Sequence, residues 1–390
     1  MSVQFPIYMD HNATTPVDPR VFEAMRPYFI EVFGNAASRG HSFGWDAEAA
    51  VDKARQQVAA LINARPDAIV WTSGATEANN LAIKGIAGTH PGGHIITQAT
   101  EHKAILDTCK RVTTRGCAVT VLGVDRFGRI DLDELRDALR PNTVLVSIMW
   151  ANNEIGTIQE IRQIGRICHD KGVLFHADAT QAVAKAPIDV DADHIDLLSM
   201  SGHKLYGPKG CGCLFVRNKP RKIELTPVLD GGGHERGYRS GTLNVPGIVG
   251  VGAACALASE YMAEETPRLT KLRDRLETGI IQHVNGVHVN GYPPSRLPHM
   301  TNLAFDGVDH DELLAAMSGI AVSSGSACTS ASLEPSYVLK AVGLPDALAF
   351  ASLRFALGKR NTEEEVDVVI ERLSRAIGKL RNAGGPRIQL

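Results

Sequence analysis

Cysteine is scarce in this 390-residue sequence: there are seven, an odd and thinly spread number that argues against a disulfide framework. The first residues lack the basic-then-apolar order of a secretory signal, and no apolar run approaches the roughly 18 residues of a membrane span. The formal net charge is only −2 and no polybasic run occurs, so nothing broadly attracts nucleic acid or a membrane surface. We therefore expect a cytoplasmic protein with no nucleic acid and no membrane as partner.

The residues that are present have the balance of a globular protein, with 44% hydrophobic and 22% charged. From about residue 50 to 205, short and almost continuously apolar segments alternate with helical patterns, which is typical of a parallel sheet buried on both faces. The segment "GCGCLFVR" follows too closely for a helical crossover and is predicted to pair antiparallel. The sequence thus predicts an α/β fold with a mainly parallel seven-stranded sheet covered by helices. The other predicted strands lie within residues 68–74, 94–102, 118–125, 143–153, 173–181 and 195–204.

The pattern changes after Val245. An Ala/Gly-rich helix and a separate charged helix are predicted up to about Val284, followed by short strands and a last helix that opens with a capping box, Thr362 and Glu365. This is typical of a smaller α+β domain. We expect three parts: an N-terminal segment that packs with the small domain, a large domain, and a small domain, over residues 1–15, 16–260 and 261–390.

Polar residues follow five of the predicted strands, where doubly wound sheets bind their ligands. Ser73-Gly74-Ala75-Thr76 opens a helix whose free N–H groups suit a phosphate. Lys204 follows the last parallel strand, and a desolvated lysine amine can form a Schiff base with an aldehyde. Together these residues describe a pocket for a phosphorylated aromatic aldehyde, pyridoxal 5′-phosphate (PLP). The residues at the other strand ends are His102, Asn153, Asp178, Gln181 and Ser201.

Each of these residue types suits one part of PLP. Asp178 would pair with the ring nitrogen and keep the ring an electron sink, while His102 would stack on the ring. Asn153 and Gln181 would hold the ring oxygen. The covalent link to the aldehyde falls to Lys204. The residues expected around the phosphate are Ala75, Thr76, Ser201, Gly202 and His203.

Seven motifs in order resemble those of the cysteine desulfurases, the class V aminotransferase relatives that serve iron–sulfur assembly and nitrogen fixation. They are "TSGATEANN", "TEHKA", "WANNEIG", "HADATQAV", "SGHKLYGPKG", "GGGHERGYRSGT" and "SSGSACTSASLEPSYVL". The resemblance implies a PLP-dependent transferase of fold type I and a homodimer. It implies that Lys204 is the PLP lysine, that Thr242 reaches the phosphate of the partner subunit, and that Cys328 is the catalytic cysteine. Arg354 matches the arginine that receives the substrate carboxylate, with Asn153 beside it.

Cys328 lies in "SSGSACTSAS", whose small residues and lack of apolar periodicity predict a loop. A thiol there can attack as a thiolate and then carry sulfur outward. We expect the enzyme to convert L-cysteine to L-alanine and to leave a persulfide on Cys328, with His102 moving protons. The sulfur would pass to an acceptor such as an iron–sulfur scaffold protein. No metal is expected to be required, although Cys328 could ligate a [2Fe–2S] cluster transiently through its persulfide.

Three alternatives stay open at this point. A selenocysteine lyase or another class V enzyme would share the pocket, although a transaminase needs no cysteine loop. A nicotinamide-dependent oxidoreductase would need a dinucleotide fingerprint, and the nearest one, "GVGAAC", lacks the last glycine and follows no clear strand. A non-catalytic sulfur carrier could use the same fold, but it would not need Lys204, Asp178 and Cys328 together.

Overall fold

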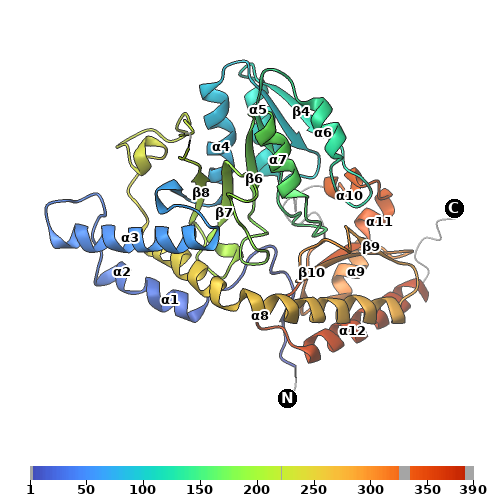
Figure 1. Ribbon diagram of the computed structural model, residues 1–390. Coiled ribbons are helices and arrows are strands. Elements are labelled where there is room, and N and C mark those ends of the chain that lie inside the picture. Colours follow the sequence, from blue (N-terminus) through green and yellow to red (C-terminus); the bar gives the residue numbers. More distant parts are fainter. Residues whose placement is uncertain (1–2, 221, 325–333, 383–390) are drawn as a thin grey trace.

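The computed structural model describes residues 3–220, 222–324 and 334–382 (Figure 1). Its centre is a seven-stranded sheet in the order β2-β8-β7-β6-β5-β3-β4, which confirms the predicted strand number. Only β8 runs against its neighbours, pairing antiparallel with β2 and β7, as its short connection predicted. The strands are β2 (Ile69–Thr72), β3 (His94–Gln98), β4 (Ala118–Leu122), β5 (Thr143–Ser147), β6 (Leu174–Asp178), β7 (Leu197–Ser201) and β8 (Gly212–Val216).

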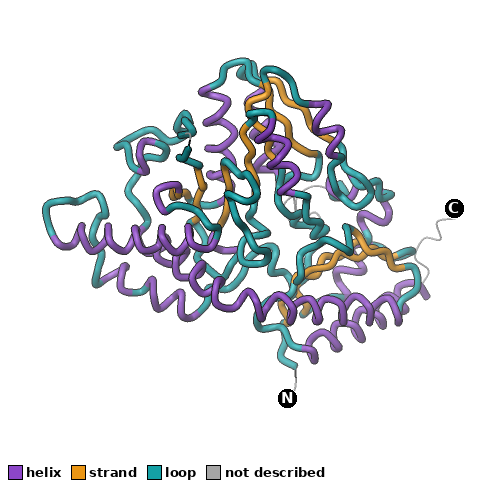
Figure 2. The backbone as a smooth tube through the Cα atoms, in the orientation of Figure 1, coloured by secondary structure: helices purple, strands orange, loops and turns teal. Residues whose placement is uncertain are grey.

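Both faces of this sheet are covered by helices because successive strand residues point to opposite sides. In β2, Ile69 and Trp71 join the apolar cluster under α3 and α8, whereas Val70 joins the cluster under α4 and α5. Figure 2 shows the strands between these two layers. The helices of the two layers are α3 (Ser42–Leu61), α4 (Ala75–Thr89), α5 (Lys103–Thr113), α6 (Leu132–Ala138), α7 (Ile161–Asp170) and α8 (Val245–His283).

The prediction of two helices between Val245 and Val284 is wrong, because one 39-residue helix, α8, spans this region with Pro267 inside it. Proline removes one backbone hydrogen bond, but packing along the whole length compensates. The first half of α8 packs on α3, and its second half packs on α12 (Glu363–Asn382). By length and composition alone α8 could cross a membrane, yet half of its most apolar window is buried inside this fold.

A second, smaller unit lies along the far half of α8 (Figure 1). Its antiparallel sheet has the order β12-β10-β9, and the N-terminal strand β1 (Ile7–Tyr8) pairs in parallel with β11 (Ile320–Ala321). The capping box of α12 is confirmed, since Thr362 and Glu365 exchange backbone-to-side-chain hydrogen bonds of 3.3 Å. The remaining elements are β9 (Val287–Asn290), β10 (Met300–Phe305), α9 (His310–Ala316), α10 (Tyr337–Ala341), α11 (Asp346–Phe350) and β12 (Ser352–Ala356).

The apolar clusters divide along α8. Cys255 belongs to the cluster of the large sheet, while Leu269 belongs to a second cluster that includes Ile7 and Met9 of the N-terminal segment. The expected boundary at residue 260 falls between these two positions, inside one continuous helix. The division into residues 1–15, 16–260 and 261–390 therefore stays a prediction. Short elements at the edges of the large unit are α1 (Pro19–Met25), α2 (Pro27–Ile30) and the 3-10 turns Pro66–Ala68, Gly202–Lys204 and Glu235–Gly237.

Candidate active site

A cavity of about 620 Å³ lies at the carboxyl edge of the seven-stranded sheet. The strand ends of β2, β6 and β7 contribute to it, and Arg354 reaches it from β12 of the smaller unit. Most of the residues predicted from the sequence line this cavity: Ala75, Thr76, His102, Asn153, Asp178, Gln181, Ser201, His203, Lys204 and Arg354. The parallel strands thus bring together groups that are up to about 280 positions apart in the chain.

Two of the predicted residues lie outside the lining, and a third is not described. Gly202 is buried in the turn between Ser201 and His203 and is not part of the lining. Thr242 is exposed on the loop before α8 and lies outside the lining of this cavity. Cys328 lies outside the described residues.

The turn Ser73–Thr76 places the N-terminus of α4 at the cavity. Within the described part of the chain no side chain caps this helix, so its first N–H groups stay available for an anion. Gly74 has a φ of +148°, which disfavours other residues. The adjacent strand also passes closely, because a Cβ on Gly212 would lie 2.8 Å from the Cα of Gly74. Ser201 completes this corner, with its Oγ 3.5 Å from where a Cβ on Gly74 would be.

Asp178 is the last residue of β6 and is held in one orientation. Its Oδ2 accepts a hydrogen bond from Nδ2 of Asn79 at 2.8 Å, and its Oδ1 accepts one from the backbone N–H of Thr180 at 3.0 Å. The sequence analysis did not identify Asn79 or Thr180. Asn79 had a signal, since it lies four residues after Ala75 and hence on the same helix face.

His102 caps α5 and presents only one ring nitrogen for proton transfer. Its Nδ1 accepts a hydrogen bond from the backbone N–H of Ala104 at 3.1 Å, so the neutral ring carries its proton on Nε2. Burial lowers the pKa of His102, and the nearby carboxylate of Asp178 opposes this shift. At neutral pH the ring is therefore uncharged, with Nε2 free to exchange a proton.

Lys204 is the last residue of the 3-10 turn that follows β7, and its side chain lies against the N-terminal segment. Its Nζ donates to the backbone oxygens of Asn12 and Ala13 at 2.5 and 2.7 Å. The side chain of Asn12 is itself fixed, donating to the backbone oxygen of Asn153 at 3.0 Å and pairing with Nε2 of His299 at 2.6 Å. Residues 12–14 line the cavity, whereas the sequence predicted only that residues 1–15 pack with the small domain. Their local sequence pattern does not indicate a contact with Lys204, which is almost 200 positions away.

His203 lies beside Lys204 but is kept neutral. Its Nδ1 is 3.1 Å from Oγ1 of Thr14 in the N-terminal segment. Burial, and then the positive charges of Lys204, Lys209 and Lys185, lower the pKa of His203 to about 4. His203 can therefore donate or accept a hydrogen bond at the cavity, but it does not add a positive charge there.

Arg354 is buried at the cavity wall with part of its guanidinium already engaged. Nη1 donates to the backbone oxygen of Asn153 at 3.0 Å, and Nη2 pairs with Oδ1 of Asp10 at 2.7 Å. Its backbone also pairs with Ser323, which stands five positions before Cys328. Arg354 and the start of the segment that contains Cys328 in the sequence are thus joined directly.

The cavity retains polar capacity that the protein itself does not use. Four buried polar atoms of cavity-lining residues have no hydrogen-bond partner among the described residues, although buried polar groups are usually paired. They are Oδ1 of Asn79, Oδ1 of Asn153, Oγ1 of Thr180 and Nε of Arg354. A lysine amine, a fixed carboxylate, an uncapped helix N-terminus and these atoms fit a polar, phosphorylated ligand such as PLP.

Among the described residues, no cluster of three or more histidine, cysteine or acidic side chains could hold a metal ion.

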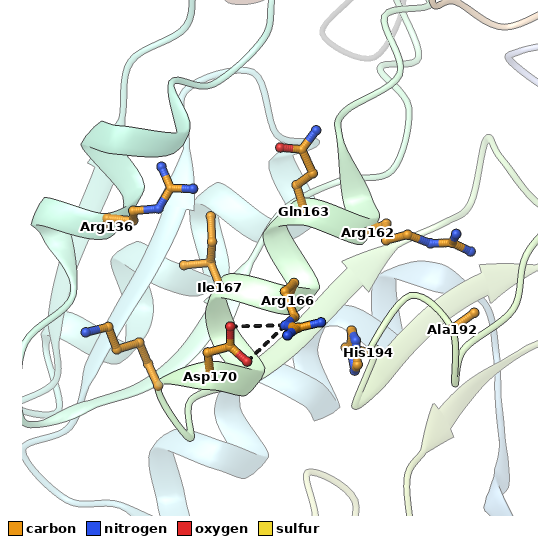
Figure 3. Close-up of a pocket in the computed structure, with 9 residues that line it drawn as sticks. Arg136, Arg162, Gln163, Arg166, Ile167, Asp170, Ala192 and His194 are labelled. Atoms are coloured by element: carbon orange, nitrogen blue, oxygen red, sulfur yellow. Dashed lines mark hydrogen bonds and ion pairs between the residues drawn. The ribbon is translucent and has the colours of Figure 1, made fainter.

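A second hollow, of about 580 Å³, lies over α7 (Figure 3). Its lining includes Arg136, Lys171 and His194, which stand before the start of β5, β6 and β7 respectively. It is therefore at the amino edge of the sheet, away from where such folds bind ligands.

Comparisons with known proteins agree with this geometry. The sequence model of the family described as "Aminotransferase class-V" matches residues 7–369, so the chain belongs to the class-V aminotransferase family. It is 54% identical over 384 residues to a protein of Dechloromonas aromatica (strain RCB) named "Cysteine desulfurase IscS", covering 98% of this chain and 94% of that protein. Within the family, the chain belongs to the cysteine desulfurases, which are PLP-dependent enzymes.

Solved structures give the same result. A "NifS-like protein" superposes with a TM-score of 0.89 at 37% identity, covering 96% of this chain and all of the other. A structure titled "SspA in complex with cysteine" superposes with a TM-score of 0.81 at 39% identity, covering 90% of this chain and 98% of the other. The predicted fold type I, the cofactor class and the family are confirmed. One of these relatives is named a cysteine desulfurase, one a NifS-like protein and one is titled as a complex with cysteine, and none of the three names a selenocysteine lyase.

Proposed function

We propose that this protein removes sulfur from L-cysteine, releases L-alanine and holds the sulfur as a persulfide on Cys328. The observation that carries the proposal is the convergence of Lys204, Asp178 and His102 on one cavity at the carboxyl edge of the sheet. Beside PLP, a lysine amine can take the Cα proton, a fixed carboxylate can keep the ring nitrogen protonated, and a neutral histidine can exchange a further proton.

The residues that would hold PLP are distributed around the cavity. The N–H groups of Ala75 and Thr76 suit the phosphate, Asp178 suits the ring nitrogen, and Lys204 suits the aldehyde. When bound, PLP supplies an electron sink for the carbon atoms of the substrate. Asp178 contributes to this chemistry by presenting a carboxylate whose orientation Asn79 and the backbone of Thr180 fix.

Substrate binding and proton transfer fall to other side chains. Arg354 would bind the carboxylate of cysteine with the donors that Asp10 and Asn153 leave free. Lys204 would hold the proton taken from Cα. His102 would exchange a proton through Nε2, since Nδ1 is engaged by the backbone. Asn12, Ala13 and Thr14 of the N-terminal segment also line the cavity.

Cys328 is the cysteine best suited to accept sulfur. Six other cysteines are free and buried, and burial raises the pKa of Cys109 and Cys211 to about 12, so these thiols are not thiolates at neutral pH. Ser323 pairs with Arg354, and Cys328 comes five residues after Ser323. Five fully extended residues span at most roughly 17 Å. The sulfur of Cys328 can therefore reach a substrate held at Arg354.

Incubation with L-cysteine and a reductant tests the function. We expect sulfide and L-alanine to appear in equal amounts, because each cleavage of the C–S bond yields one of each. Both products are measured in the same samples, and L-selenocysteine is run in parallel. Release of pyruvate in place of alanine, or activity confined to selenocysteine, would contradict the proposal.

We also propose that the protein is a homodimer. Six large apolar side chains are exposed on α1, α2, the loop after α2 and the start of α3, and such clusters mark interaction surfaces. Thr242 is exposed and does not line the cavity of its own chain, which is compatible with a role across the dimer. We call the cluster the α1–α3 patch. Its members are Phe22, Phe29, Ile30, Phe33, Phe43 and Trp45.

A charge in the α1–α3 patch should separate the subunits. Ile30 is 79% exposed in the single chain, so Ile30→Asp costs the folded monomer little but buries a carboxylate in a dimer. We expect a shift from dimer to monomer, measured by sedimentation velocity, with weaker PLP retention. Ile281→Asp, at an apolar residue 45% exposed near the end of α8, is the control. A dimer that persists in Ile30→Asp would exclude this patch as the interface.

The acceptor and the compartment complete the proposal. We infer that the persulfide sulfur passes to a protein acceptor, such as an iron–sulfur scaffold, and that no nucleic acid takes part. We place the enzyme in the cytoplasm, because its core contains free cysteines, which suit a reducing compartment.

A further inference from the structure

Lys185 is a second lysine at the active site, and the chemistry proposed above does not use it. It lies in the turn after β6, four residues beyond Gln181, and is partly buried. Its Nζ donates to Oε1 of Gln181 at 3.3 Å and to the backbone oxygen of Lys204 at 3.4 Å. Burial, and then repulsion from Lys204, lower the pKa of Lys185 to about 7.

The contact with Lys185 restricts the side-chain amide of Gln181 to one orientation. Oε1 accepts from Lys185, and Nε2 donates to the backbone oxygen of Asn12 at 3.0 Å. Rotating the amide by half a turn would place Nε2 against the Lys185 amine and Oε1 against the Asn12 oxygen, so both contacts would become repulsive. An amide nitrogen has two N–H groups, and one of them stays available at the cavity that Gln181 lines.

The same contacts extend to the catalytic lysine. The backbone oxygen of Asn12 accepts from both Gln181 and Nζ of Lys204. Lys185 also holds the backbone of the turn that bears Lys204. Behind it, a small cavity of about 30 Å³ is lined by Lys185, His11 and His299. Lys185 thus fixes two cavity residues without lining the active-site cavity itself.

We propose that Lys185 is a positioning residue that orients the Gln181 amide, so that an N–H rather than an oxygen meets the ring oxygen of PLP. The inference rests on the proposed function, because it requires PLP in the cavity beside Gln181. An N–H at this position stabilises an anionic ring oxygen, whereas an amide oxygen would repel it.

The test is Lys185→Met, which keeps the apolar stem and removes the donor. We expect the dissociation constant for PLP to rise about tenfold, because the buried Oε1 of Gln181 loses its hydrogen-bond donor. It is measured by titrating PLP into full-length protein from which the cofactor has been removed, following protein fluorescence and PLP absorbance. Lys185→Arg keeps a donor and should restore most of the affinity. Lys171→Met, an exposed lysine beside α7, is the control and should bind PLP like the parent.

A double-mutant cycle separates positioning from a general structural role. If Lys185 acts through Gln181, Lys185→Met should have no further effect on PLP affinity in a Gln181→Leu background. Losses that simply multiply in the double variant would overturn the inference, as would unchanged affinity in Lys185→Met alone. If Lys185→Met does not fold, Lys185→Gln is used in the same cycle. A parent protein that binds no PLP would instead overturn the proposed function.

Discussion

Replacing Lys204 with alanine is expected to lower sulfide production by at least about 10³-fold, because both the covalent attachment of PLP and the base at Cα are lost. Besides Lys209, the lysine that lines the cavity is Lys204. Its Nζ lies on the backbone oxygens of Asn12 and Ala13 inside the cavity, whereas Lys185 points to Gln181 and to the backbone of Lys204. The measurement combines initial rates with borohydride reduction of the holoenzyme and peptide mapping of the labelled lysine.

Lys204→Arg is the informative companion of this variant. The guanidinium keeps the positive charge but stays protonated, so it neither condenses with an aldehyde nor accepts the Cα proton. We expect Lys204→Arg to be as inactive as Lys204→Ala. Substantial activity in the arginine variant would mean that position 204 contributes only charge. Borohydride labelling of another lysine in the parent protein would remove Lys204 from its proposed role altogether.

Cys328→Ser is expected to give a PLP-loaded, well-folded protein that forms no persulfide and releases sulfide only at the background rate. The serine hydroxyl cannot accept the sulfur atom of the substrate, because it is not ionised at neutral pH and cannot form an S–S bond. The other cysteines cannot replace it, because burial raises the pKa of their thiols, as at Cys109 and Cys211. PLP absorbance reports loading, and mass spectrometry of the peptide that contains residue 328 reports the added sulfur.

Ser330→Ala, two residues further along the same segment, is the matched control for Cys328→Ser and should retain the persulfide and the parent rate. A Cys328→Ser protein that produced sulfide as fast as the parent would show that sulfur leaves the substrate without this thiol. A persulfide found on one of the core cysteines would assign the transfer to that cysteine instead.

The residues at the strand ends were predictable because their signal is local. A buried strand followed by Asp178, or by Ser201 and Lys204, can be recognised from a few consecutive residues. Because the carboxyl ends of parallel strands lie at the same edge of a sheet, residues that follow different strands are then expected to lie close together. The structure accordingly brings Thr76, His102 and Asp178 to one cavity.

The residues that were missed have no local signal. The N-terminal strand β1 pairs with β11 in the smaller unit, and the residues that follow it reach the large unit. This is how the backbone oxygen of Asn12 contacts Lys204 and Gln181. An Ala/Gly-rich stretch and a charged stretch predicted two helices, and Pro267, a residue type that usually interrupts a helix, lies inside the single helix observed. Contacts with α3 and α12 at opposite ends hold α8 continuous instead.

The sequence by itself determined the α/β fold, the seven strands and the positions of the lysine, carboxylate and histidine that line the cavity, because hydrophobic periodicity and the polar residues at strand ends can be recognised from neighbouring residues. Only the tertiary structure decided how these groups are oriented. The proton position on His102, the contacts that fix Asp178, and the partners of Lys204 and Arg354 depend on hydrogen bonds between distant segments. Such contacts arise from how the packed units meet, and no local pattern encodes them.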